Sequence, residues 1–135
     1  MALIHSEEGR YAEALKTLRK FAGHGDEDSN AETWNNIGNV LERQGNYGEA
    51  LRALRKSYKM KCKVLGRRHY TSAKVLTSIG NVEEKLGKFP IAMASYQESL
   101  DVLTDRCGPD SEPVYDCHAR YVHLISISFF RLSQC

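Results

Sequence analysis

The chain has 135 residues, 41% of them hydrophobic, and its 19 basic and 17 acidic residues give a formal net charge of +2. This length suits one domain with a buried core, and the near balance of charge gives no general reason to expect nucleic acid or an acidic membrane as partner. Glu7 and Glu8 lie where a signal peptide needs an apolar stretch, and the apolar run at 121–130 is too short to cross a bilayer, so we expect a cytoplasmic protein.

Six helices are expected along the chain. Apolar residues recur at helical spacing over 11–22, and the glycine-containing stretch 23–26 then breaks the helix. Ser29 is predicted to cap the next helix, with Glu32 completing a capping box, and this helix runs to about Gln44. The remaining helices are predicted at 47–65, at 71–87 with Thr71 or Ser72 at its start, at 89–107, and at 111–132.

The second and fourth of these helices share a sequence. Ile37-Gly38-Asn39-Val40 returns 42 positions later as Ile79-Gly80-Asn81-Val82, and 45–51 matches 87–93 at the same distance. A third copy of the latter segment lies at 9–15. A period in this range indicates a solenoid of repeated helix pairs. We therefore divide the chain into a partial first repeat (1–28), two repeats (29–70 and 71–110) and a terminal half-repeat or capping helix (111–135). The first repeat lacks most of its opening helix unless residues 1–8 form a short one.

Small residues indicate how each pair packs. Gly38 and Ala50 fall on the facing stripes of two paired helices, and Trp34 and Tyr47 fill the space beside them. A bulky residue at Gly38, or at Gly80 in the next repeat, should force the pair apart at a cost of roughly 1–3 kcal/mol.

The repeat at 29–70 carries the residues of a known family. The tetratricopeptide pattern is matched by Trp34, Ile37-Gly38, Leu41, Gly45, Tyr47, Ala50 and Leu54. The 42-residue spacing, the ending Val64-Leu65-Gly66 and the pair Asn35-Asn36 resemble kinesin light chain repeats. The resemblance implies an all-α, right-handed α-solenoid of antiparallel helix pairs, which acts as a non-catalytic adaptor or scaffold for a protein or peptide partner. The second repeat departs from the pattern at Leu76 and Glu83.

A polar stripe on the first helix of each repeat is the predicted binding groove. Asparagine offers both donors and an acceptor, so it can bond the backbone of an extended peptide, and the resemblance implies such contacts. The alternative is that these residues are simply solvated. The predicted groove residues are Asn35, Asn36, Asn39, Arg43, Lys74, Thr77, Ser78, Asn81 and Lys85.

Two other surfaces carry competing hypotheses. The helix at 47–65 and the residues after it are strongly basic, which allows nucleic acid or an acidic partner. Single-stranded nucleic acid would need aromatic side chains on which bases stack, and Tyr58 is the only one within the run, so a solvated convex face is favoured. The last helix is apolar on most of its circumference, so either another unit follows or the chain forms a homo-oligomer. The residues predicted for self-association are Tyr121, Ile125, Phe129 and Phe130.

No motif predicts catalysis, a cofactor or a metal. The chain has no glycine-rich phosphate loop, no nucleophile motif and no H-E-x-x-H. Its cysteines form no C-x-x-C pair, and the spacing of Cys107, Cys117, His118 and His123 fits no metal-binding loop, so we expect free thiols. The cysteines are Cys62, Cys107, Cys117 and Cys135.

Overall fold

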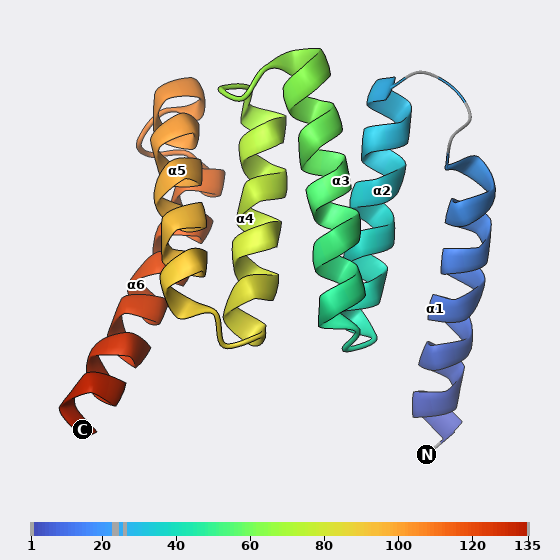
Figure 1. Cartoon of the computed structure of the whole chain (residues 1–135), viewed down its shortest axis with the longest axis horizontal. Helices are drawn as coiled ribbons and strands as arrows, with labels where there is room; N and C mark the ends of the chain where they lie inside the picture. Colours follow the sequence, from blue (N-terminus) through green and yellow to red (C-terminus); the bar gives the residue numbers. More distant parts are fainter. Residues whose placement is uncertain (1, 23–24, 26, 135) are drawn as a thin grey trace.

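A computed structural model describes residues 2–22, 25 and 27–134 and contains six α-helices and no strand within those residues (Figure 1). The all-α solenoid predicted from the sequence is confirmed. The helices are α1 (Ala2–Phe21), α2 (Glu27–Arg43), α3 (Tyr47–Leu65), α4 (Tyr70–Lys85), α5 (Phe89–Cys107) and α6 (Glu112–Gln134).

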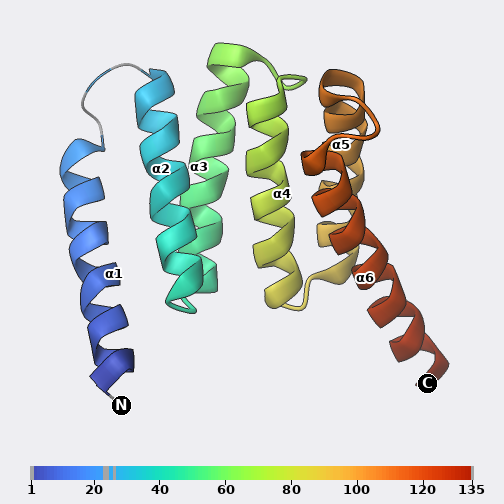
Figure 2. The ribbon, with the colours of Figure 1, turned by 180° about the vertical axis from the view of Figure 1, so that it is seen from behind.

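The helices form two layers of antiparallel neighbours. Figure 1 shows α3 in front of α2 and α5 in front of α6, and Figure 2 shows the opposite face, on which α2, α4 and α6 lie nearest the viewer. Each first helix of a pair therefore lies on one side of the array, and each second helix lies on the other. Across the part of the chain that the structure describes, no helix has the length and apolar character needed to cross a membrane.

The core consists of two apolar clusters, one for each complete pair. The first joins α2, α3 and α4 around Ile37, Leu54 and Ile79, and the second joins α5, α6 and the start of α4 around Tyr96 and Leu124. Each cluster lies both within a pair and between neighbouring pairs. The pairs are thus held in one continuous stack, as expected of a repeat protein.

Close approach at two glycines is confirmed. A Cβ atom added at Gly38 would lie 2.6 Å from Leu54 Cγ, and one at Gly80 would lie 2.8 Å from the Tyr96 ring. Both distances are far inside van der Waals contact, so a side chain at either position must displace a buried neighbour. The two helices of each pair meet at the glycine that the repeat places there.

Three helix starts differ from the predictions. α1 is one helix from Ala2 that continues through Gly9, so residues 2–8 form no separate opening helix. α2 begins at Glu27, which places Ser29 inside the first turn rather than at the cap; acidic residues favour a helix N-terminus as well as serine does. His69 caps α4, its Nδ1 accepting from the Thr71 amide at 3.2 Å. Residues 23, 24 and 26 of the predicted break lie outside the described residues.

Candidate functional site

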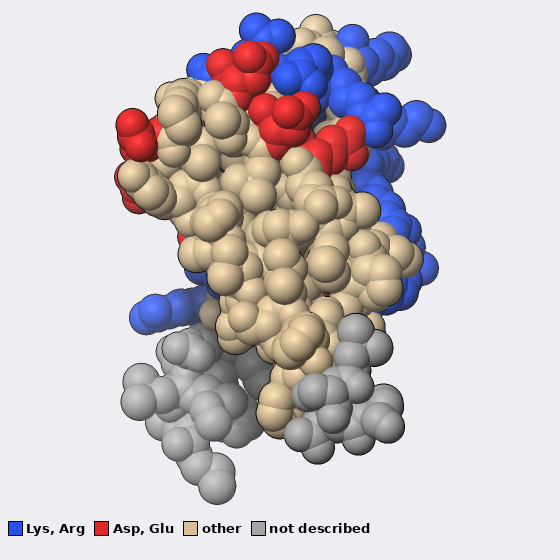
Figure 3. Space-filling model, turned by 90° about the vertical axis from the view of Figure 1, so that its left-hand side faces the viewer, with Lys and Arg blue, Asp and Glu red and all other residues tan. Residues whose placement is uncertain are grey.

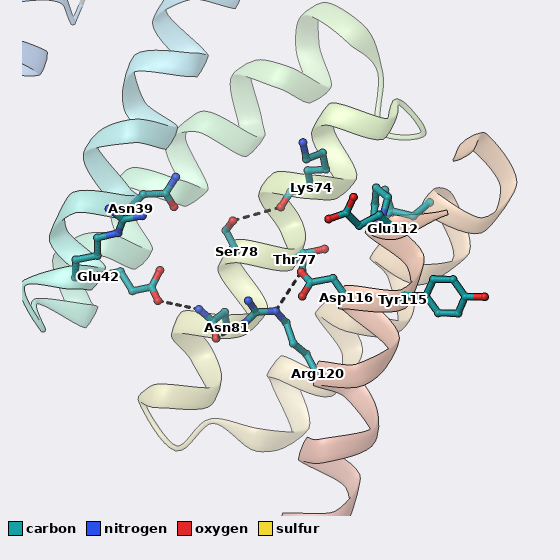
Figure 4. A pocket seen from close by; sticks show the side chains of 13 residues that line it. Asn39, Glu42, Lys74, Thr77, Ser78, Asn81, Glu112, Tyr115, Asp116 and Arg120 are labelled. Atoms are coloured by element: carbon teal, nitrogen blue, oxygen red, sulfur yellow. Dashed lines mark hydrogen bonds and ion pairs between the residues drawn. The ribbon is translucent and has the colours of Figure 1, made fainter. Parts of the chain in front are cut away.

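A hollow of about 940 Å³ runs along the face formed by the first helices of the pairs. It lies between α2, α4 and α6, and Figure 4 shows side chains from all three helices pointing into it. A volume of this size is at the upper end of the range seen for small-molecule sites and suits part of an extended chain. The lining residues are Asn39, Glu42, Arg43, Lys74, Thr77, Ser78, Asn81, Leu103, Glu112, Pro113, Tyr115, Asp116 and Arg120.

Six of the nine predicted groove residues line this hollow, and three do not. Lys85 is not a lining residue, and its Nζ binds Glu42 Oε1 at 2.7 Å and sits over the Tyr47 ring. Asn36 is exposed outside the hollow, and Asn35 lies a full turn before Asn39, with its Oδ1 buried and unbonded among the described residues. Of the three asparagines of α2, only Asn39 lines the hollow.

Asn81 has both ends of its amide occupied. Its Nδ2 donates to Glu42 Oε1 at 2.8 Å, and its Oδ1 accepts from Arg120 Nη1 at 2.9 Å (Figure 4). Arg120 also pairs with Asp116 at 3.5 Å. Asn81 therefore joins α2, α4 and α6 in one polar chain along the groove floor, and these two bonds fix the orientation of its amide.

The hydroxyl groups of α4 are also used within the protein. Thr77 Oγ1 donates to Ala73 O at 3.1 Å and lies 2.5 Å from Ser99 Oγ. Ser78 Oγ donates to Lys74 O at 3.4 Å. These two residues shape the groove wall but have little hydrogen-bonding capacity left for a ligand.

Asn39, Arg43 and Lys74 keep side chains with no bonded partner among the described residues. Asn39 and Arg43 come from α2, and Lys74 comes from α4, so an amide and two cations line one flank of the hollow. Glu112 on α6 lies across from Lys74 in Figure 4. The groove thus has a basic flank on α2 and α4, and an acidic residue at the start of α6.

The α6 contribution was missed by the sequence analysis, although the repeat carried the signal. Asp116 and Arg120 stand 42 positions after Lys74 and Ser78, and so occupy the same places on their helix. Extending the groove register into the last helix would have found both residues. Glu42, the third partner of the floor, lies on the predicted stripe one turn after Asn39.

Two basic side chains of α3 are paired with carboxylates. Lys61, with a side chain only 5% exposed, pairs with Glu32 at 3.1 Å, and Arg55 pairs with the buried Glu83 at 3.6 Å. Beyond the helix, Arg67 binds Glu98 and Arg68 binds Asp101 and Asp105. Lys56 stacks on the Trp34 ring at 4.2 Å. These pairs offset part of the positive charge, while Arg52 and Lys59 stay exposed on this face.

The four residues predicted for self-association divide into two groups. Tyr121 packs against the α5–α6 core and its hydroxyl accepts from Gln97 Nε2 at 2.7 Å. Ile125, Phe129 and Phe130 are exposed. Cys107 is exposed and Cys117 is fully buried against Thr77 and the Tyr96 carbonyl, while Cys135 lies outside the described residues.

Stacked helix pairs with a polar groove along their first helices define a helical-repeat scaffold. The family is shown by sequence: the profile described as tetratricopeptide repeat matches residues 29–105, more than half of the chain, which belongs to that family. Such repeats are protein–protein interaction modules and typically act as non-catalytic adaptors. In their 42-residue spacing, the two repeats resemble the kinesin light chain type.

A solved structure shares the fold. The crystal structure of BtubC (BKLC) from P. vanneervenii superposes with a TM-score of 0.82 at 17% sequence identity. The match covers 94% of this chain and 52% of that one, so the present chain spans about half the length of its structural relative. No curated protein sequence matches the chain.

Proposed function

We propose that the groove between α2, α4 and α6 binds an extended segment of a protein partner, and that the chain acts as a non-catalytic adaptor in the cytoplasm. The observation that carries this proposal is the combination of a hollow of about 940 Å³ with three polar side chains, Asn39, Arg43 and Lys74, that have no partner within the described residues. Family membership supports the general role, because tetratricopeptide repeats bind proteins.

The free side chains suit a peptide backbone with an anionic group nearby. An extended segment has backbone N–H and C=O groups that no helix satisfies, and the Asn39 amide can donate to one and accept from the other. Arg43 and Lys74 add two cations on the same flank, which favour a carboxylate or phosphate on the ligand. Because the interface is small, we expect a dissociation constant on the order of micromolar.

The polar chain on the floor gives the groove a fixed shape before a ligand arrives. Glu42 and Arg120 hold Asn81 from opposite sides, so the first helices of three successive units keep a set spacing. A preformed groove loses less conformational entropy on binding than one that must assemble. Asn81 thus serves as a brace in this proposal, and Asn39 as the ligand contact.

The proposal is tested by affinity capture with matched variants. The groove variant Asn39→Ala/Arg43→Ala/Lys74→Ala removes one amide and two cations, and the control Asn46→Ala/Arg52→Ala/Lys59→Ala removes the same groups from exposed positions outside the groove. Proteins retained by the native chain and the control, but lost with the groove variant, are the expected result. Circular dichroism should show equal helicity for all three.

Two outcomes would contradict the groove. Equal retention by both variants would show that the partner binds elsewhere. Loss with the control alone would favour the basic face of α3, where Arg52 and Lys59 are exposed, and a nucleic acid or acidic partner on that face should then bind with a steep dependence on salt.

A further inference from the structure

The outer face of α6 corresponds to a helix face that is covered in both complete repeats. The 42-residue shift relates Ala31 and Ala73 to Tyr115, and Gly38 and Gly80 to Val122. In the two repeats these positions meet the second helix of their own pair: the Ala31 carbonyl accepts from Ser57 on α3, and the Ala73 carbonyl accepts from Ser99 on α5. The same face of α6 has no second helix within the described residues.

This face is apolar and exposed. Tyr115 is 61% exposed, Val122 46%, Ile125 38% and Phe129 73%. Figure 3 views the α5–α6 end of the molecule and shows a broad central area without Lys, Arg, Asp or Glu, bordered by charged side chains above and at its right-hand edge. Large apolar side chains exposed together on an uncharged face mark an interaction surface.

The residue spacing on this face is that of a coiled-coil seam. Tyr115, His118, Val122, Ile125 and Phe129 are separated by three, four, three and four positions, the a/d pattern of a heptad repeat. The flanking positions carry Ala119, Tyr121, Ser126 and Ser128, none of which is charged. We call the five seam residues the α6 seam.

The size of the α6 side chains excludes a second helix that packs as closely on α6 as α3 packs on α2. The second helix of each repeat approaches its partner through alanine and glycine, with 2.6 Å or 2.8 Å to the place where a glycine Cβ would lie. Tyr115 and Val122 fill the corresponding places on α6 with large side chains. A helix lying on α6 must therefore stay further away, and pack side chains between side chains as coiled-coil helices do.

We propose that the α6 seam pairs with the α6 seam of a second copy of this chain, related by a two-fold axis. A two-fold interface requires a patch that complements itself. The seam meets this requirement because its members are large and uncharged, and its flanks bring no like charges together. Tyr115 is the one seam residue that also lines the hollow, and Figure 4 shows its ring pointing away from the side chains of α2 and α4. The other four seam residues are not among the lining residues, so pairing leaves most of each groove open.

Sedimentation equilibrium tests the pairing directly. The native chain should show a mass that rises from one copy towards two with concentration, with a dissociation constant on the order of 10 μM for a single helix pair. Val122→Glu should raise this constant more than about tenfold, because the carboxylate would be buried against an apolar seam. The matched control is His123→Glu, which places the same carboxylate on the exposed neighbouring position, off the seam, and should leave the constant unchanged.

Charge complementation then identifies the seam as its own partner. Chains carrying Val122→Glu/Ile125→Glu and chains carrying Val122→Lys/Ile125→Lys should each sediment as single copies, and an equal mixture should recover the two-copy mass. A mixture that stays single would overturn the proposal even if the native chain associates, since another surface would then be responsible. A native chain that sediments as one copy throughout, or equal effects of Val122→Glu and His123→Glu, would overturn it as well.

Discussion

At the residue scale, the glycine of each repeat contacts a different side chain on the second helix of its pair. Gly38 receives the Leu54 side chain, whereas Gly80 receives the ring of Tyr96, which is fully buried. The Tyr96 hydroxyl donates to Glu84 Oε1 at 3.3 Å, so the ring is held at both its face and its tip. The larger partner in the second repeat leaves less freedom to move aside.

Gly80→Ala should therefore lower the free energy of unfolding by about 1–3 kcal/mol. Alanine favours a helix by about 1 kcal/mol over glycine, but its Cβ would lie 2.8 Å and 2.9 Å from two Tyr96 ring carbons. The measurement is urea unfolding followed by circular dichroism. Gly48→Ala on α3 is the control: nothing lies near its Cβ, so it should be neutral or stabilising by up to about 1 kcal/mol. A Gly80→Ala variant as stable as the control would refute the close contact.

At the scale of the helix pair, one hydrogen bond recurs that the repeat pattern did not predict. Ser57 Oγ on α3 donates to Ala31 O on α2 at 2.6 Å, and Ser99 Oγ on α5 donates to Ala73 O on α4 at 2.7 Å. Both serines are fully buried, and they are 42 positions apart. Each bond joins the middle of a second helix to the first turns of its partner and so fixes the offset between them.

Ser57→Ala should lower the free energy of unfolding by about 1 kcal/mol, the usual net contribution of a buried hydrogen bond. Ser99→Ala should cost more, because Thr77 Oγ1 loses its contact with Ser99 Oγ at 2.5 Å as well. Thermal unfolding of the two variants gives the comparison. Ser126→Ala is a suitable reference, since its hydroxyl bonds only within the exposed surface of α6 and its loss should change little. Equal costs at all three positions would contradict the predicted order.

At the scale of the whole molecule, burial of three proton-bearing groups links stability to alkaline pH. Burial raises the pKa of Tyr58 to about 12, and burial, with Glu84 close by, raises that of Tyr96. Burial also raises the pKa of the Cys117 thiol. The unfolded chain releases these protons near the ordinary values of 9.0 for cysteine and 10.0 for tyrosine. Above those values it binds fewer protons than the folded chain.

Stability should therefore be complete below about pH 9 and should fall as the pH rises from there towards 12, because a raised folded-state pKa favours folding only while the group stays protonated. Urea midpoints at about pH 8 and about pH 10.5 measure the loss. Tyr58→Phe removes one of the three groups and should reduce the difference between the two midpoints. An unchanged midpoint across this range would contradict the linkage.

Local sequence predicted much of the array and less of the site. The 42-residue shift predicted the helix pairs and the contacts at Gly38 and Gly80, because those depend on helical periodicity and residue size. The starts of α1, α2 and α4 were predicted late, since several residue types can begin a helix equally well. The sequence could not distinguish Asn81 from Asn39. Only Asn81 is bonded on two sides within the groove floor.

The sequence by itself determined the all-α class, the repeat and the family resemblance, because a repeating pattern of apolar and small residues has one compact solution in stacked helix pairs. Only the tertiary structure decided which polar side chains are free. The partners of Asn81 lie 39 positions away on each side, in α2 and α6, and their reach depends on the spacing and angle between helices. The exposure of the α6 seam within the described residues was likewise visible only in the tertiary structure, because exposure depends on how α6 packs against α4 and α5.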